Sequence, residues 1–344
     1  MSENKTDNGR QILIGERAVQ REYRLSIAPM MDWTDRHCRY FHRLLTKNAL
    51  LYTEMVTTGA LLHGDVPRHL RFNAEEHPLA LQLGGSEPTE LAHCARLGEQ
   101  WGYDEINLNC GCPSERVQRG AFGACLMAEP QLVADCVKAM VNAVSVPVSV
   151  KHRIGIDHSE SYDFVRDFVG AVSEAGCNTF IVHARNAWLK GLSPKENREI
   201  PPLRYDLAHR LKSDFPALVI CVNGGIKTSE QVAQQLERVD GVMVGREAYH
   251  NPWWLSTWDA DFFAAARSVQ MTREQVEEEM VVYMEREATA DGTPWYSVAR
   301  HMLGLRHGLP GARRWRQVWS DHRLKTWPAR EVLARAHQSV CETG

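Results

Sequence analysis

Short apolar runs recur eight times along the chain, and each of them ends in polar or glycine residues. Their length and their β-branched residues predict buried strands, and stretches with helical character, such as 90–101 and 129–144, lie between most of them. This alternation of strands and helices favours a parallel sheet closed into a (β/α)8 TIM barrel. The predicted strands cover residues 25–31, 51–56, 79–85, 105–109, 146–152, 179–185, 218–225 and 241–246.

The end of the first predicted strand argues against the main structural alternative, an open doubly wound sheet. A sheet of that kind carries a glycine-rich phosphate-binding turn after its first strand. Here the strand ends in Ala28-Pro29-Met30-Met31, which contains no glycine. The barrel is therefore the preferred prediction.

The hydrophobic pattern changes beyond about residue 260. Thr272 and Gln275 have the spacing of a helix capping box, and helical periodicity follows to about residue 289. We predict a flexible tail over 1–21, a catalytic barrel over 22–260 and a small all-helical domain over 261–344.

The last third of this helical domain is basic. Residues 300–330 contain eight Lys or Arg and a single acidic residue, with Trp315, Trp319 and Trp327 among them. Positive charge segregated in this way within an acidic protein is typical of a nucleic-acid-binding surface.

Composition and cysteine usage narrow the class of protein. Hydrophobic residues make up 44% of the chain, charged residues 24%, and the net charge is −3, as in ordinary globular proteins. The nine cysteines are scattered and form no CxxC pair, so no metal site is predicted. The polar N-terminus and the lack of an apolar run of about 18 residues predict neither a signal peptide nor a membrane span. The expected location is the cytoplasm.

Polar groups end several of the predicted strands, and in a barrel these ends meet at the catalytic face. Burying polar groups without partners is costly, so their convergence indicates a binding site rather than packing. A thiol in the loop after the fourth strand is a candidate acid or nucleophile, and a proline with neighbouring methionines can pack on a flat ring. The residues concerned are Pro29, Met30, Met31, Gln82, Asn109, Cys112, Lys151 and His183.

The last two strands indicate a phosphate site. Asn223, Gly224 and Gly225 end the seventh strand, and Gly245 and Arg246 end the eighth. Loops at these positions of a barrel often bind phosphate, and an arginine adds charge-assisted hydrogen bonds.

A flat polar ring with a phosphate is thus the expected ligand. FMN fits, and pyridoxal phosphate would fit the phosphate site with Lys151 as its Schiff base. Gln82, Asn109, Lys151 and His183 together better suit the larger polar edge of a flavin.

Several motifs, in order and spacing, make the chain resemble the A-type bacterial tRNA-dihydrouridine synthases over about residues 25–315. One departure is Cys110, where the family more usually has an aliphatic residue, and it places a second thiol near Cys112. The motifs are APMM at 28–31, LQLGG at 81–85, NCGCPS at 109–114, GACLM at 123–127, VHAR at 182–185, NGGI at 223–226, VGR at 244–246, RHMLGL at 300–305 and GARRWR at 311–316.

This resemblance implies a reduction of the uracil C5–C6 double bond in the D-loop of tRNA, around positions 20 and 20a, with bound FMN and with NADPH as reductant. It implies that the hydride reaches C6 from reduced FMN, that Cys112 protonates C5 and that Asn109 positions the uridine. It also implies two pairs of RNA-contacting residues and an enzyme that acts as a monomer, with tRNA as its partner. The pairs are Lys195 with Arg198, and Arg313 with Arg316.

Two other functions remain open on the sequence. A flavin barrel that acts on a small free pyrimidine would explain the strand ends but would leave the basic helical domain without a role. A non-enzymatic RNA-binding protein on a degenerate barrel would explain the basic stretch but not the complete set of polar strand ends.

Overall fold

The structure, a computed structural model, describes residues 23–263 and 271–341, so the predicted tail over 1–21 lies outside the described part. The described chain divides into two compact units. The first contains residues 23–31 and 48–245, and the second contains residues 32–47 together with the described residues from 246 onward.

The first unit is the predicted TIM barrel, which confirms the fold class. Eight parallel strands follow one another around it in the order β1-β9-β8-β7-β6-β5-β4-β2. A parallel bridge between Ser26 and Leu50 joins the two ends of this order, so the sheet is nearly closed. The strands are β1 (Leu25–Ile27), β2 (Leu51–Tyr52), β4 (Leu79–Gly84), β5 (Glu105–Cys110), β6 (Val148–Arg153), β7 (Thr179–His183), β8 (Val219–Asn223) and β9 (Gly241–Val244).

The predicted strand at 51–56 is the one that differs most from the structure. It consists of β2 and a second short strand, β3 (Val56–Thr57), and both pair with β4. Between them, Thr53 still donates its N–H to the Ala80 carbonyl of β4 at 3.0 Å, and its hydroxyl accepts from the backbone N–H of Gln82 at 3.0 Å.

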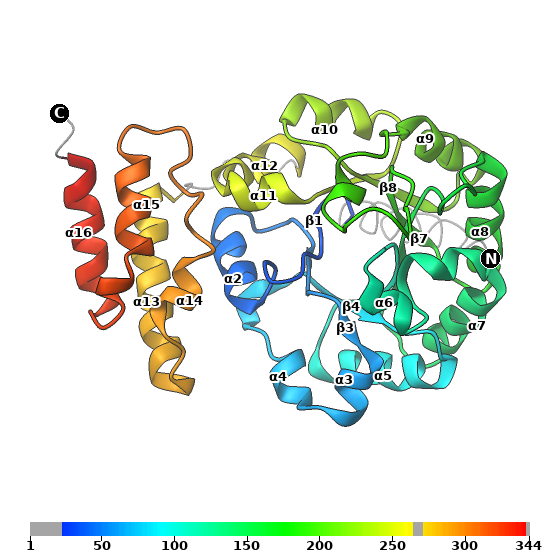
Figure 1. The fold of residues 1–344 in the computed structure, drawn as a ribbon, viewed down its shortest axis with the longest axis horizontal. Helices are drawn as coiled ribbons and strands as arrows, with labels where there is room; N and C mark the ends of the chain where they lie inside the picture. Colours follow the sequence, from blue (N-terminus) through cyan, green and yellow to red (C-terminus); the bar gives the residue numbers. More distant parts are fainter. Residues whose placement is uncertain (1–22, 264–270, 342–344) are drawn as a thin grey trace, which may run out of the picture. The chain divides into compact units, whose positions relative to one another are not determined.

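Helices surround the strands of this unit, as Figure 1 shows for α5, α7, α8, α9 and α10. Side chains define several of their ends: Ser161 caps α8 and Thr228 caps α10, and α5 ends at the left-handed Gly102. The helices are α3 (Thr58–His63), α4 (Val66–Leu70), α5 (Pro88–Trp101), α6 (Glu115–Arg119), α7 (Pro130–Val141), α8 (Tyr162–Glu174), α9 (Tyr205–Asp214) and α10 (Ser229–Leu236).

The second unit is helical, as predicted for the C-terminal part. It also takes in α2, which lies between β1 and β2 in sequence, and it begins at 246 rather than at the predicted boundary near 260. The capping box is present: Thr272 and Gln275 exchange hydrogen bonds at 2.8 and 3.2 Å. The helices are α2 (Arg36–Leu45), α11 (Arg246–His250), α12 (Leu255–Phe262), α13 (Arg273–Asp291), α14 (Trp295–Ala299), α15 (Ala312–Ser320) and α16 (Ala329–Cys341).

Two of the tryptophans in the basic stretch belong to the core of this unit. Trp315 and Trp319 are buried, with ring centroids 6.2 Å apart, and Trp319 also contacts Trp295 at 5.7 Å. Only Trp327 of the three is exposed. The alternation of tryptophan and arginine along α15 therefore reflects one packed face and one solvent face.

Acidic residues pair with four of the eight Lys and Arg in the basic stretch, and for three of them the partner is distant in sequence. Arg306 bonds Glu277 at 2.6 Å and Glu274 at 2.8 Å, and Arg330 bonds Glu285 at 3.0 Å. Arg300 pairs with Asp35, and Arg323 with Asp321. The positive surface is thus smaller than the eight Lys and Arg of the stretch suggest. Its exposed residues include Arg313, Arg314, Arg316 and Lys325.

Replacing Arg306 by Met should destabilise the protein by about 3–5 kcal/mol, because it leaves the fully buried Glu277 carboxylate without its guanidinium. Urea unfolding of the full chain measures the loss. Arg323→Met is the matched control: Arg323 is 79% exposed, so its loss should leave the free energy of unfolding close to that of the wild type. Equal effects of the two changes would contradict this account.

Candidate active site

The strand pairing brings most of the predicted ring-binding residues to one end of the barrel interior. Asn109 on β5 lies opposite Lys151 on β6, and His183 on β7 lies opposite Asn223 on β8. Gln82 lies one strand further round, opposite Asn107 of β5. Because side chains alternate along a strand, these positions share the interior face.

The carboxamide of Asn109 shapes the loop that carries Cys112. Its Oδ1 accepts hydrogen bonds from the backbone N–H groups of Gly111 at 3.1 Å and Cys112 at 3.0 Å. The Cys112 side chain is half-buried, and its Sγ lies 3.5 Å from the Ser114 hydroxyl. Asn109, on the strand that precedes the loop, therefore holds the backbone of Cys112 in place, while the thiol remains partly accessible.

The segment after this loop packs closely on it. Gly123 has φ +78°, and a Cβ there would lie 2.6 Å from the carbonyl oxygen of Cys112. Ala124 donates its N–H to the same carbonyl at 2.9 Å. Only glycine permits this approach, which explains the glycine in the GACLM motif.

Cys110 points away from the interior site. It is fully buried, and its pKa is raised well above the usual value by burial and by the nearby Cys136 and Cys177. Cys110 and Cys112 are both free thiols. Cys110 ends β5 and is buried, whereas Cys112 lies two residues later in the loop and is half-buried, so the two thiols have different surroundings.

The barrel mouth is electrostatically positive. Burial, together with the nearby Arg153 guanidinium, lowers the pKa of Lys151 to about 7. Burial and the cations of Arg153 and Lys151 also hold the pKa of His183 well below its usual value, so its imidazole is neutral near pH 7. Such a site favours an anionic ligand, which would restore the charge of Lys151.

Arg153 is a site residue that the sequence reasoning missed. Its Nε donates to the carbonyl of Gly111 at 3.1 Å, and its Nη1 donates to the carbonyls of Asn186 at 3.2 Å and Asn197 at 2.9 Å. It thereby connects the Cys112 loop with the loop after β7. Its position two residues after Lys151, on the same side of β6, was the available signal.

The predicted phosphate turn after β8 has the backbone that requires glycine. Gly224 and Gly225 have φ values of +124° and +71°, and a Cβ on Gly224 would lie 3.0 Å from the His183 ring. Asn223 points back into the sheet and donates to the Met243 carbonyl at 2.8 Å. Arg246 begins α11, directly after Gly245, and belongs to the second unit.

The remaining predicted residues lie in loops and on a helix surface. Pro29 and Met30 are half-buried after β1, and Met31 is exposed. Lys195 and Arg198 are exposed in the loop after β7, and this loop folds around the buried Asn197, whose Nδ2 donates to the Trp188 carbonyl at 2.9 Å. Arg313 and Arg316 are both exposed on α15.

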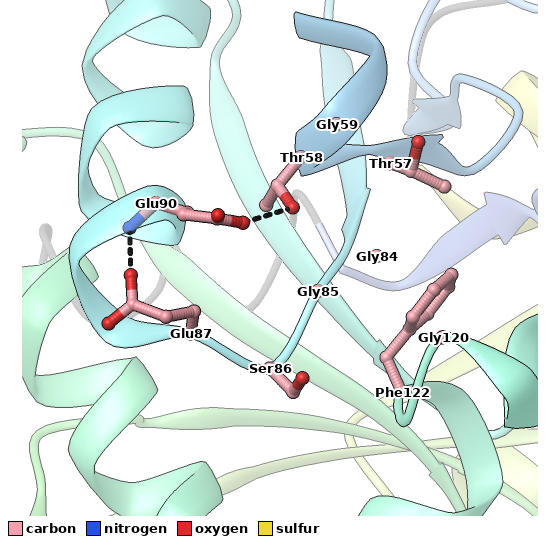
Figure 2. Close-up of a pocket in the computed structure, with 10 residues that line it drawn as sticks. All are labelled: Thr57, Thr58, Gly59, Gly84, Gly85, Ser86, Glu87, Glu90, Gly120 and Phe122. Carbon is pink, nitrogen blue, oxygen red and sulfur yellow. Dashed lines mark hydrogen bonds between the residues drawn. The ribbon is translucent and has the colours of Figure 1, made fainter. Parts of the chain in front are cut away.

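Two hollows lie in the barrel unit and were not predicted. A cavity of about 300 Å³ lies at the ends of β3 and β4. Phe122 forms one of its walls (Figure 2), and Thr58, also in its lining, donates to Glu90 at 2.8 Å. A groove of about 980 Å³ lies between the segment 113–118 and the loop 189–194. The Gln118 amide links the two sides of this groove, with a bond of 2.8 Å to the Leu189 carbonyl.

Within the described residues, no group of three or more His, Cys, Asp or Glu side chains is placed to hold a metal ion. Over the same residues, no helix has the length and apolar character needed to cross a bilayer.

The fold and the site define a (β/α)8-barrel enzyme with a thiol beside polar and basic groups at the C-terminal ends of its strands. The sequence model of the family described as dihydrouridine synthase (Dus) matches residues 26–340. The chain belongs to the dihydrouridine synthase family, which confirms the resemblance seen in the sequence.

Named relatives are similar over nearly their full length. The tRNA-dihydrouridine(20/20a) synthase of Pseudomonas putida is 61% identical over 320 residues, which cover 92% of this chain and 93% of the relative. The protein of the same name from Escherichia coli O6:H1 is 57% identical over 321 residues, covering 93% and 96%.

A more distant likeness concerns the fold alone. A solved complex of 2-naphthoyl-CoA reductase with 2-naphthoyl-CoA superposes with a TM-score of 0.54 at 12% identity, over 70% of this chain and 50% of that one. At that identity the likeness supports the barrel architecture.

Lys151 should titrate near pH 7 in the ligand-free protein, with its Nζ resonance followed by NMR across pH 5–11. Arg198→Ala should raise the midpoint, because Arg198 is a further cation that lowers the pKa of Lys151. Arg204→Ala is the control, since Arg204 pairs with Asp206 at the surface and should leave the midpoint unchanged. A midpoint near the ordinary lysine value of 10.5 would refute the burial argument.

Proposed function

We propose that this protein is an FMN-dependent tRNA-dihydrouridine synthase that reduces D-loop uridines at positions 20 and 20a with NADPH. The observation that carries the proposal is the accessible Cys112 thiol, held by Asn109 beside the polar barrel mouth. The family match and the names of the relatives support the same reaction and the same tRNA positions.

The residues at the barrel mouth suit FMN. The turn at Gly224 and Gly225, where neither residue has a side chain, allows a phosphate to approach the backbone closely. The VGR motif makes Arg246 the expected cation for that phosphate, as an inference from the sequence. Beyond its bonds to Asn107 and Asn109, the Gln82 carboxamide has a second N–H and a second lone pair with which to donate to and accept from a flavin edge. The half-buried Pro29 and Met30, with the exposed Met31 after them, supply apolar contact for a flat ring.

Bound FMN would supply hydride transfer to C6 of the uracil ring, with NADPH as the source of electrons. In its protonated form Lys151 stabilises negative charge on the ring, and the neutral His183 can donate or accept a hydrogen bond. The positive character of the site therefore favours the reduced, anionic state of the ring.

Cys112 would deliver the proton to C5. A thiol is a weak acid that can donate a proton near neutral pH, and the half-buried position lets a base approach the Sγ. The Oδ1 of Asn109 accepts from the Cys112 loop, and one hydrogen of its Nδ2 is donated to Gln82. The second Nδ2 hydrogen can therefore orient the uracil.

The uridine must leave the folded tRNA to reach this site, so the enzyme needs an RNA-docking surface. Lys195 and Arg198 lie exposed in the loop that Arg153 connects to the Cys112 loop. Arg313 and Arg316 lie on the exposed face of α15, opposite its buried tryptophans. The exposed basic face of α15 favours tRNA over a small free pyrimidine as the substrate.

Cys112→Ala should abolish dihydrouridine formation while flavin absorbance and flavin reduction by NADPH persist, because only the proton donor is removed. Mass spectrometry of tRNA incubated with purified protein measures the product and its position. Cys110→Val is the matched control and should retain activity, since that thiol is buried away from the site. Product formation by Cys112→Ala at the normal rate would exclude Cys112 as the acid.

Replacing Arg313 and Arg316 together by Ala should lower the slope of log affinity for tRNA against log salt by about one to two, because at most two phosphate contacts are lost. Filter binding across salt concentrations measures the slope. The control with the same charge change is Arg166→Ala with Arg204→Ala, since both arginines already pair with neighbouring aspartates. An unchanged slope would remove α15 from the RNA footprint and favour the small-pyrimidine alternative.

A further inference from the structure

A ladder of polar side chains runs down the barrel interior below the Cys112 loop. On β5 every second residue is polar and faces inward: Glu105, Asn107 and Asn109 are 2%, 0% and 8% exposed. The neighbouring strands contribute Gln82 and Ser149, which are paired with Asn107 in register and are equally buried. Glu105 begins the strand, at the opposite end of the barrel from Cys112.

Every hydrogen bond in this ladder runs in one direction, toward Glu105. The backbone N–H groups of Gly111 and Cys112 donate to Asn109 Oδ1. The links below are Asn109 Nδ2 to Gln82 Oε1 at 2.9 Å, Gln82 Nε2 to Asn107 Oδ1 at 2.7 Å, Asn107 Nδ2 to Ser149 Oγ at 2.7 Å, and then Ser149 Oγ to Glu105 Oε1.

The Glu105 side chain sets the direction of these hydrogen bonds, as the number of donor hydrogens at each link shows. Glu105 accepts from the Ser149 hydroxyl, which has a single hydrogen to give. Once Ser149 donates to Glu105, it must accept from Asn107, so the Asn107 oxygen turns toward Gln82. Tyr52 also donates to Glu105 at 2.9 Å, which leaves the carboxylate as the acceptor at the end of the chain.

The same reasoning determines the orientation of the Gln82 and Asn109 carboxamides, which face the active site. Gln82 gives its N–H to Asn107 and therefore presents its oxygen to Asn109. Asn109 gives its N–H to Gln82 and therefore presents its oxygen to the Gly111 and Cys112 amides. Reversal of the chain would turn the Asn109 NH2 group toward these backbone N–H groups, which is a donor against donors.

We propose that Glu105 is a positioning residue that fixes the orientation of the Gln82 and Asn109 carboxamides, and through them the conformation of the Cys112 loop. The roles of those carboxamides toward flavin and uracil rest on the proposed function, but the hydrogen-bond order does not. Bonds in such a chain polarise one another, so the acceptor at its far end strengthens the upper links.

Hydrogen exchange at the backbone amides of Gly111 and Cys112 tests this proposal in the full-length protein without FMN or tRNA. Glu105→Leu removes the terminal acceptor, so both amides should exchange at least about tenfold faster, as expected for the loss of roughly one hydrogen bond's free energy. Glu105→Gln keeps an oxygen that can accept from Ser149 and Tyr52. It should restore protection close to the wild-type level.

Val165→Ala is the control for general loss of stability, since Val165 is a fully buried residue on α8 of the same unit. It should leave exchange at Gly111 and Cys112 unchanged relative to the other amides of β5. If Glu105→Leu does not fold, Ser149→Ala breaks the same chain one link higher and should accelerate the same two amides.

Wild-type exchange at these amides in Glu105→Leu, or in Ser149→Ala if Glu105→Leu does not fold, would overturn the proposal. So would equal acceleration in Val165→Ala. Because the measurement uses neither flavin nor RNA, its outcome is independent of whether Cys112→Ala still makes dihydrouridine. Failure of the positioning role and failure of the proposed reaction are thereby distinguishable.

Discussion

The register of β5 between β4 and β6 is the constraint on which the site depends. It places Asn107 opposite both Gln82 and Ser149, and Asn109 opposite Lys151. Side chains alternate along a strand, so a slip by one residue would turn this polar face toward the helices and expose it to an apolar environment. Asn107 reaches both Gln82 and Ser149 only in the observed register, so polar pairing and strand pairing enforce each other.

Much of the barrel was predictable because strand periodicity and strand ends are local properties of the sequence. The eight strands, the capping box at Thr272 and the polar strand ends all follow from neighbours within a few residues. Arg153 and Glu105 were not recognised because their importance lies in partners on other segments, such as the Gly111 carbonyl and the Ser149 hydroxyl. The association of α2 with the C-terminal helices was equally non-local.

The basic stretch shows the same limit for electrostatics. A count along the sequence gives a large positive excess, but the fold brings acidic side chains of α13 to Arg306 and Arg330. Likewise, Trp315 and Trp319 interleave with arginines in sequence yet pack inward on α15. What remains exposed is a smaller surface, and its unbalanced charge rather than its composition makes it suitable for a polyanion.

The choice of carboxamides at the barrel mouth follows from the cost of burial. A second charged group beside Lys151 and Arg153 would either pair with them or repel them, and both outcomes would change the positive character of the site. A carboxamide carries donors and acceptors without net charge, so it can be buried at lower cost and still bind a ring edge. Its weakness is that its two ends are nearly identical in shape. A one-way chain of hydrogen bonds that ends at a carboxylate removes that ambiguity, since each amide then has a single orientation that satisfies its neighbours.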